Sequence, residues 1–168
     1  ALALVRMKRV DAENVQRRKN ADHIRIATTE LPGLRSIPAG IAEGVYPVYY
    51  NYIFAYVFAE TGISRSQFAK AVQAEGIPLR CGFYQPLNLL PVFTNLDAWP
   101  YRLEENRLSV ERDLYGEGKC PVGEAFMAQG HLELKMHPPA SAREMGETVE
   151  AIKKVIENAG DLVGREVS

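Results

Sequence analysis

The run from 80 to 88, Arg-Cys-Gly-Phe-Tyr-Gln-Pro-Leu-Asn, carries the densest set of side chains that could bind or act on a ligand. Two aromatic rings, Phe83 and Tyr84, precede the amide of Gln85, a proline turn and the amide of Asn88. At the end of a strand, such residues can present hydrogen-bonding amides and flat aromatic rings to a ligand in a cleft. The alternative is a pair of packing aromatics followed by an ordinary turn, and the residue types alone leave both interpretations open.

Outside this run the sequence offers little recognisable chemistry. It has no glycine-rich phosphate loop, no Ser–His–Asp signature and no Cys or His pair with metal-ligand spacing. His131 and His137 share a face across an expected strand end, but no third ligand accompanies them, so we expect no metal site. Cys81 and Cys120 form neither a disulfide framework nor a metal motif; free thiols are the default, and a bond between them stays open.

Composition limits the classes of protein that remain. A chain of 168 residues has room for one domain with a real core, and its 46% hydrophobic and 24% charged residues are ordinary globular values. A net charge of −1 provides no field to attract nucleic acid or anionic lipid, and the basic run 17–19 lies among acidic residues as a solvated helix face does. The longest apolar run, near 45–58, is too short and too rich in tyrosine for a membrane helix. We therefore expect no nucleic-acid or membrane partner and a cytoplasmic location.

The first residues predict a long helix that must belong to something larger. Apolar residues recur with helical spacing up to Leu31, over roughly 30 residues, which is about twice the usual globular length. No capping residue precedes the first turn, and there is no initiator Met. Helices of this length usually join two domains. We therefore interpret 1–34 as an inter-domain helix and 35–168 as the C-terminal small domain of a larger protein.

The remaining pattern predicts a small α+β domain. Strands are expected over 45–58, 77–84 and 131–136, with the last one half-buried, and the first one aromatic on a face that suits a cleft or an interface. Capping boxes at Ser64 and Ser141 predict the starts of helices that end near Gly76 and Gly160. Shorter helices are expected over 101–115 and 122–129. The expected fold is a mainly antiparallel three-stranded sheet with helices packed on one face.

Several segments, taken together, resemble the DegT/StrS sugar aminotransferases, which depend on pyridoxal phosphate. The resemblance is carried, in order, by 1–14, 17–21, 31–34, Tyr-Tyr-Asn-Tyr at 49–52, 64–68, 74–78, Gly-Phe-Tyr-Gln-Pro-Leu at 82–87, 120–125 and 145–155. It covers nearly the whole chain. The segment 82–87 is most similar to the branch that acts on keto-inositols, and amino-sugar branches stay open.

The resemblance implies the role of this chain rather than a catalytic residue within it. In such enzymes the Schiff-base lysine lies in a large N-terminal domain, and no lysine here has that context, so we expect no catalytic residue and no bound cofactor in this chain alone. The small domain closes over the substrate. The implied cleft residues, which should then be solvent-accessible, are Tyr50, Asn51, Phe83, Tyr84, Gln85, Asn88 and His137. Phe83 is a departure from the family, because several relatives have a tyrosine in this aromatic segment.

The resemblance implies that the parent enzyme transfers an amino group from glutamine or glutamate to a keto-sugar or keto-inositol. The alternative is a stand-alone, non-catalytic binding or assembly domain derived from that family. In either case, removing a large domain would bare apolar surface on the long helix and on the tyrosine-rich strand. Because such patches rarely stay exposed on a monomer, we expect a homo-oligomer.

Overall fold

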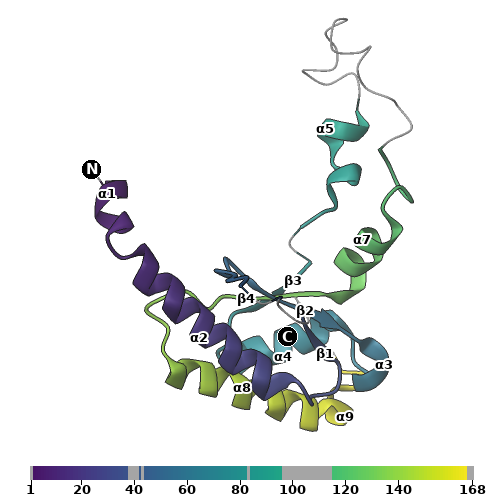
Figure 1. Ribbon diagram of the computed structural model, residues 1–168. Coiled ribbons are helices and arrows are strands. Elements are labelled where there is room, and N and C mark those ends of the chain that lie inside the picture. Colours follow the sequence, from purple (N-terminus) through teal and green to yellow (C-terminus); the bar gives the residue numbers. More distant parts are fainter. Residues whose placement is uncertain (1, 38–41, 43, 83, 96–114, 166–168) are drawn as a thin grey trace, which may run out of the picture. The chain divides into compact units, whose positions relative to one another are not determined.

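The computed structural model describes residues 2–37, 42, 44–82, 84–95 and 115–165. The chain divides into two compact units, which are treated separately below. The first unit consists of Ala1–Cys81 and His131–Ser168, and the second of Gly82–Gly130. The first unit holds the sheet and the long helices, while the second holds short helical turns (Figure 1).

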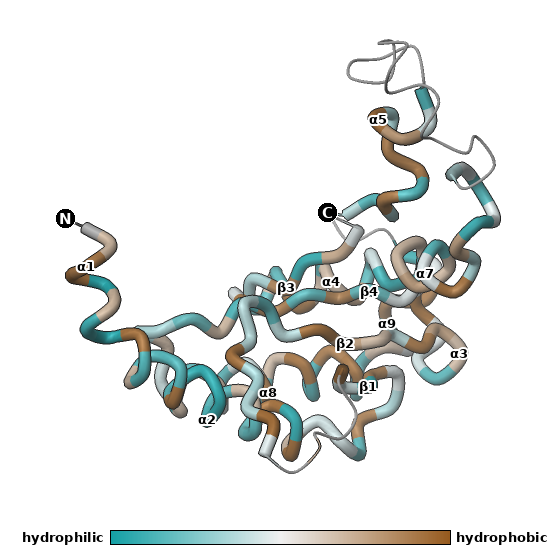
Figure 2. The backbone as a smooth tube through the Cα atoms, turned by 45° about the horizontal axis from the view of Figure 1, so that its top comes forward, coloured by the Kyte–Doolittle hydropathy of each residue, from teal (hydrophilic) through white to brown (hydrophobic). Residues whose placement is uncertain are grey.

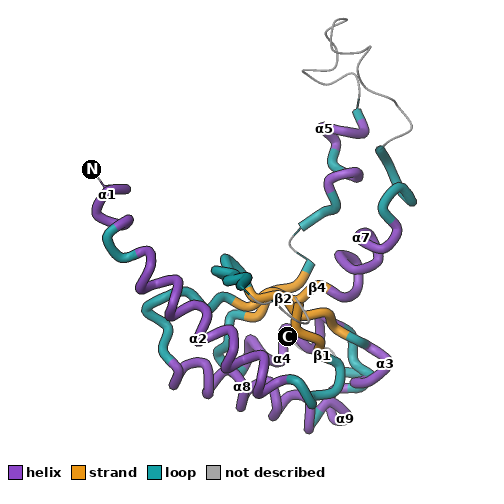
Figure 3. Tube along the Cα trace, in the orientation of Figure 1, coloured by secondary structure: helices purple, strands orange, loops and turns teal. Residues whose placement is uncertain are grey.

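The first unit is built on a four-stranded antiparallel sheet (Figure 3). Its strands are β1 (Leu34–Ile37), β2 (Tyr52–Tyr56), β3 (Leu79–Cys81) and β4 (His131–Leu134), in the order β1-β2-β4-β3. The α+β class is confirmed, but the sheet has four strands and not three. The extra strand, β1, pairs with β2 along its whole length. The prolines and glycines around this segment predict irregular structure, so the pairing could not be expected from local signals.

The central strand β4 is more buried than its sequence pattern suggests. Leu132 and Leu134 face inward as expected, but His131 and Glu133 on the opposite face are also buried. The expectation of a half-buried strand is therefore wrong. In this internal strand Glu133 lies in register between Ile53 of β2 and Arg80 of β3, and it forms an ion pair with Arg80.

The N-terminal helix is interrupted rather than continuous. It consists of α1 (Leu2–Met7) and α2 (Val10–Thr28), with a turn at Lys8 and Arg9 between them. Only the second half of α2 contributes buried side chains, namely Asn20, Ala21, Ile24 and Thr28. Figure 2 shows hydrophilic residues along much of α2. Further toward the N-terminus, the apolar side chains of Leu4, Val5, Val10 and Val15 are exposed.

Both predicted capping boxes are confirmed. Ser64 caps α4 (Arg65–Ala74) and Ser141 caps α8 (Ala142–Glu157), each in a reciprocal pair with the residue three positions on. With α2 they lie on one face of the sheet (Figure 1), and the short helices α3 (Phe58–Thr61) and α9 (Ala159–Leu162) complete the layer. The core between helices and sheet consists of fully buried apolar side chains, among them Phe54, Phe68, Val72, Leu79, Leu132, Leu134 and Ile152.

The aromatic segment before β2 is not strand. Extended pairing begins only at Tyr52, although a strand was expected from 45. Pro47 lacks an N–H group, and Tyr49 has a φ of 25°, a left-handed conformation that breaks regular pairing. As a result Tyr52 is buried in the core, whereas Tyr46 and Tyr50 are exposed.

The second unit contains short turns of helix. They are η1 (Leu87–Leu89), α5 (Pro91–Thr94), α7 (Pro121–Ala125) and η3 (Phe126–Gly130), which is a π-helical turn. The helix expected over 122–129 corresponds to α7 followed by η3. The helix expected over 101–115 lies almost entirely outside the described residues.

Candidate functional site

The first unit has a groove of about 780 Å³ beside the break between α1 and α2. Two of the predicted cleft residues, Tyr50 and His137, line it, and their ring centroids are 5.5 Å apart. The other lining residues are Arg6, Arg9, Glu13, Asn14, Arg17, Val48, Pro138 and Pro139. The arginines were not predicted as site residues, because in the sequence they look like an ordinary solvated helix face.

The groove carries surplus positive charge. One carboxylate, Glu13, is shared by two guanidinium groups, at 3.3 Å from Nη2 of Arg17 and 3.8 Å from Nε of Arg9. Arg17 also donates to Oδ1 of Asn14 at 2.7 Å, and Arg6 lies on the same groove. Two arginines that share one glutamate leave an unbalanced charge, so the groove suits an anionic or hydroxyl-rich ligand.

His137 is held as a neutral ring in this groove. Burial lowers its pKa, and the positive charges of Arg17 and Lys135 lower it further. At neutral pH the imidazole therefore has one donor and one acceptor nitrogen. Its Nδ1 is buried and has no hydrogen-bond partner within the described part of the chain.

A buried amide on α2 sets the position of the segment that carries His137. Nδ2 of Asn20 donates to the carbonyl oxygens of Ala140, at 2.9 Å, and Met136, at 3.3 Å. Its own Oδ1 accepts from Gln16 at 2.8 Å. These bonds bridge the chain between α2 and the residues on either side of His137. Asn20, buried on the core face of α2, therefore holds in place the segment that carries His137 in the groove.

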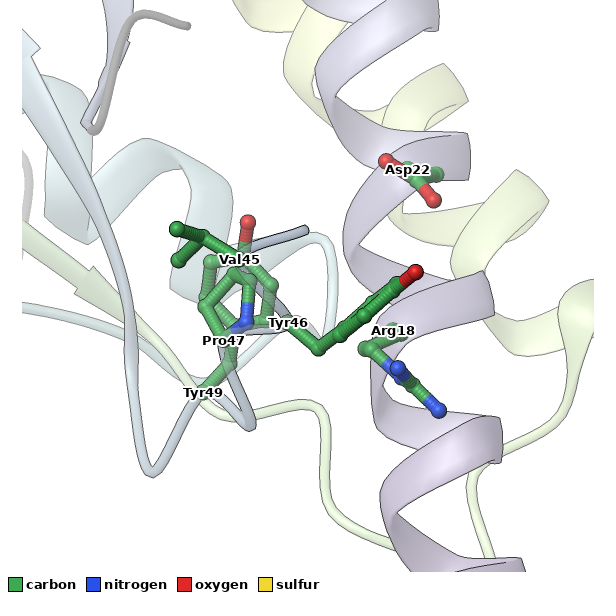
Figure 4. A pocket seen from close by; sticks show the side chains of 6 residues that line it. All are labelled: Arg18, Asp22, Val45, Tyr46, Pro47 and Tyr49. Atoms are coloured by element: carbon green, nitrogen blue, oxygen red, sulfur yellow. The ribbon is translucent and has the colours of Figure 1, made fainter. Parts of the chain in front are cut away.

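The residues just before Tyr50 lie along α2 and form a second, smaller hollow (Figure 4). It measures about 100 Å³ and is lined by Arg18, Asp22, Val45, Tyr46, Pro47 and Tyr49. The guanidinium carbon of Arg18 lies 5.1 Å from the centre of the Tyr46 ring, a cation–π contact that ties this segment to α2. Asn51 lines neither hollow. It is half-buried, and its Oδ1 has no partner among the described residues.

The second unit has a hollow of its own, of about 270 Å³. It is lined by Gly82, Tyr84, Gln85, Pro86, Leu89, Glu124, Met127 and Ala128. Tyr84 is 43% exposed and Gln85 is exposed, as expected for residues of a cleft. Phe83 lies outside the described residues. The structure therefore brings together Tyr50 and His137 in the groove of the first unit, and Tyr84 and Gln85 in the hollow of the second.

Asn88 differs from its neighbours because it is only 7% exposed. The expectation that its amide would be accessible is wrong. Its Nδ2 donates to the carbonyl of Gly116 at 2.8 Å and to Oε1 of Glu124 at 2.7 Å, so internal contacts use both of its donors. These partners lie about thirty residues further along the chain, so the sequence around the proline turn could not indicate them.

These three hollows do not fit a covalently held pyridoxal phosphate, because none of them is lined by a lysine. Within the described residues no group of three His, Cys, Asp or Glu side chains could hold a metal ion. Over the same residues, no helix is both long enough and apolar enough to cross a membrane. What the hollows offer is binding through charge, amides and aromatic rings.

Comparison with known proteins identifies the class. Residues 1–113 match the DegT/DnrJ/EryC1/StrS aminotransferase family, and the chain belongs to this family. The sequence has no match among curated proteins. Solved structures with the same fold include Spr1654 from Streptococcus pneumoniae, described as a sugar aminotransferase in its PMP form, at 21% identity and a TM-score of 0.64 over 93% of this chain. DesV from S. venezuelae, solved with a ketimine intermediate, gives 18% identity and a TM-score of 0.67, also over 93%.

The match covers only part of those proteins. This chain spans 34% of the length of Spr1654 and 35% of that of DesV. At these identities the likeness establishes the fold.

Proposed function

We propose that this chain is the substrate-side small domain of a pyridoxal-phosphate-dependent aminotransferase. Membership of the family over residues 1–113 supports this assignment most directly. The reaction is the transfer of an amino group from glutamine or glutamate to a keto-sugar or keto-inositol. The bound cofactor would serve as the electron sink for that transfer.

The chain's own residues bind and orient the acceptor in this proposal. Tyr50 and His137 offer a pair of aromatic rings tilted at 46° to each other, and the arginines beside them offer charge. Gln85 and Tyr84 offer an amide and an exposed ring in the second unit. Amides, imidazole and aromatic faces are the groups that recognise a hydroxylated ring. The lysine that holds the cofactor belongs to another part of the enzyme.

The test is a chimera in which this chain replaces the corresponding third of Spr1654. We expect the chimera to transfer the amino group of glutamine or glutamate to a keto-sugar or to scyllo-inosose. As a control, the 168-residue chain alone should show no single lysine trapped by pyridoxal phosphate and borohydride on peptide mapping. A chimera that shows the cofactor's absorbance band but transfers to neither acceptor would contradict the proposal, as would stoichiometric trapping at one lysine of the chain alone.

We also propose that the chain self-associates. On α1 the apolar side chains Leu4, Val5 and Met7 are 68%, 57% and 67% exposed, and the aromatic segment adds Tyr46 and Tyr50. A patch of this kind is unfavourable in water. Light scattering at high micromolar concentration should show a dimer or a larger species, and Val5→Asp should shift it toward monomer. A wild-type chain that stays monomeric would rule out this arrangement.

A further inference from the structure

The second unit contains a set of polar contacts centred on Glu124. Its Oε1 accepts hydrogen bonds from the backbone N–H of Cys120, at 2.9 Å, and from Nδ2 of Asn88, at 2.7 Å. Its Oε2 accepts from the backbone N–H of Gly118 at 2.9 Å. Both carboxylate oxygens are therefore engaged by donors from two separate stretches of chain.

Asn88 completes the contact set. Its Nδ2 also donates to the carbonyl oxygen of Gly116 at 2.8 Å, and the N–H of Gly116 donates back to the carbonyl oxygen of Asn88 at 2.8 Å. Close by in the chain, the rings of Phe93 and Tyr115 are stacked with their centroids 5.1 Å apart. We call Asn88, Gly116, Gly118, Cys120 and Glu124 the clasp, because hydrogen bonds among them join Asn88 to the stretch 116–124.

The loop in the clasp depends on this carboxylate for its shape. Gly116 and Gly118 have φ values of 113° and 80°, so residues without side chains occupy these two left-handed positions of the loop. Free N–H groups of such a loop need an acceptor, and a carboxylate is a stronger acceptor than a neutral oxygen. Without Glu124 the loop loses its acceptor, and Asn88 loses one of its two partners.

The clasp also borders the hollow of the second unit. Glu124 lines this hollow together with Tyr84 and Gln85. Asn88 follows Gln85 by three residues, and Nε2 of Gln85 donates to the carbonyl of Leu89, just past Asn88, at 3.3 Å. A fixed Asn88 therefore fixes the turn on which Gln85 is carried.

We propose that Glu124 is a positioning residue for the acceptor-binding segment. Through Asn88 and the loop 116–120 it keeps the turn that carries Tyr84 and Gln85 in one conformation at the rim of the hollow. The consequence for substrate binding rests on the proposed function, whereas the clasp itself does not.

The protonation state of Glu124 provides a direct readout. The backbone N–H groups of Gly118 and Cys120 lower the pKa of its carboxyl group, and the amide of Asn88 lowers it further. A group with a lowered pKa in the folded state contributes stability above its ordinary pKa and loses this contribution as the pH falls through the lowered value. The clasp should therefore be intact at neutral pH and should open only in acid, below the ordinary range for glutamate.

The experiment compares Glu124→Gln with Glu117→Gln in the 168-residue chain by NMR. Glu117 is exposed in the same loop, so its substitution makes the same change in charge. In Glu124→Gln the amides of Gly118 and Cys120 should exchange at least about tenfold faster, and the side-chain resonances of Asn88 and Gln85 should move. In Glu117→Gln exchange should stay within about twofold of wild type. The amide of Ile152, in the core of the first unit, reports whether the effect is local.

Equal exchange in the two variants would overturn the proposal. A loss of protection at Ile152 as large as that at Gly118 would overturn it too, because Glu124 would then merely stabilise the whole chain. If Glu124→Gln fails to fold, acid titration of the wild-type chain decides: the Asn88 side-chain resonances should shift with a midpoint below the ordinary glutamate range, and a flat profile contradicts the clasp.

The functional readout uses the chimera with Spr1654. Glu124→Gln should raise KM for the keto acceptor about tenfold and leave the half-reaction with the amino donor unchanged. A change in the donor half-reaction, or no change in KM, contradicts the positioning role. If the unsubstituted chimera transfers no amino group, the proposed function fails, while the NMR result on the clasp stands by itself.

Discussion

Replacing Arg80 with alanine should lower the free energy of unfolding by about 3–5 kcal/mol. Arg80 on β3 lies opposite Glu133 on β4, and the two side chains form an ion pair across the strands. Glu133 is fully buried, with 0% of its side chain exposed, and its Oε2 has no partner within the described residues. Removing Arg80 would leave a buried carboxylate without its counter-charge. Urea unfolding at pH 7, followed by circular dichroism at fixed protein concentration, measures this loss.

Two further variants separate burial from charge. Arg35→Ala removes the Arg35–Glu60 ion pair, in which both side chains are substantially exposed, and should cost far less. The double variant Arg80→Met with Glu133→Leu removes both charges together and should recover most of the stability that Arg80→Ala loses. Equal losses for Arg80→Ala and Arg35→Ala would show that the buried pair is screened by water.

Phe68→Ala should lower the free energy of unfolding by about 3–5 kcal/mol. The ring of Phe68 on α4 is fully buried, and its centroid lies 5.1 Å from that of Tyr56 on β2. Truncation removes buried apolar surface and leaves a cavity between helix and sheet that the surrounding core cannot fill. The matched control is Phe58→Ala, because Phe58 is 60% exposed. Urea unfolding should show little loss for the control, and similar losses for the two variants would contradict the assigned core.

Helix starts and the family could be predicted from the sequence because both depend on local signals. The capping boxes at Ser64 and Ser141 involve residues only three positions apart, so their hydrogen bonds follow from the sequence directly. The family resemblance depends on ordered short segments, and residues 1–113 confirm it. The exposure of Tyr84 and Gln85 was expected from the cleft role that the family resemblance implies.

Other features needed the folded chain. The strand β1 exists because β2 supplies its partners, and nothing within Leu34–Ile37 indicates a strand strongly. In β4, the alternating pattern predicts that Glu133 faces outward as an exposed charge, yet it is buried and forms an ion pair with Arg80 of β3. The long helix breaks at Lys8 and Arg9, although its apolar spacing continues through them.

The candidate site divides in the same way. The sequence by itself determined which types of residue are available: tyrosines, histidine, amides and a strand end that presents them. Only the tertiary structure decided that Arg6, Arg9 and Arg17 line one groove with Tyr50 and His137, and that Asn88 is buried against Glu124 rather than open to a ligand. The physical reason is the range of the interactions. Capping and periodicity act over a few residues, whereas the partners of Asn88 and His137 come from distant parts of the chain and meet only when the chain has folded.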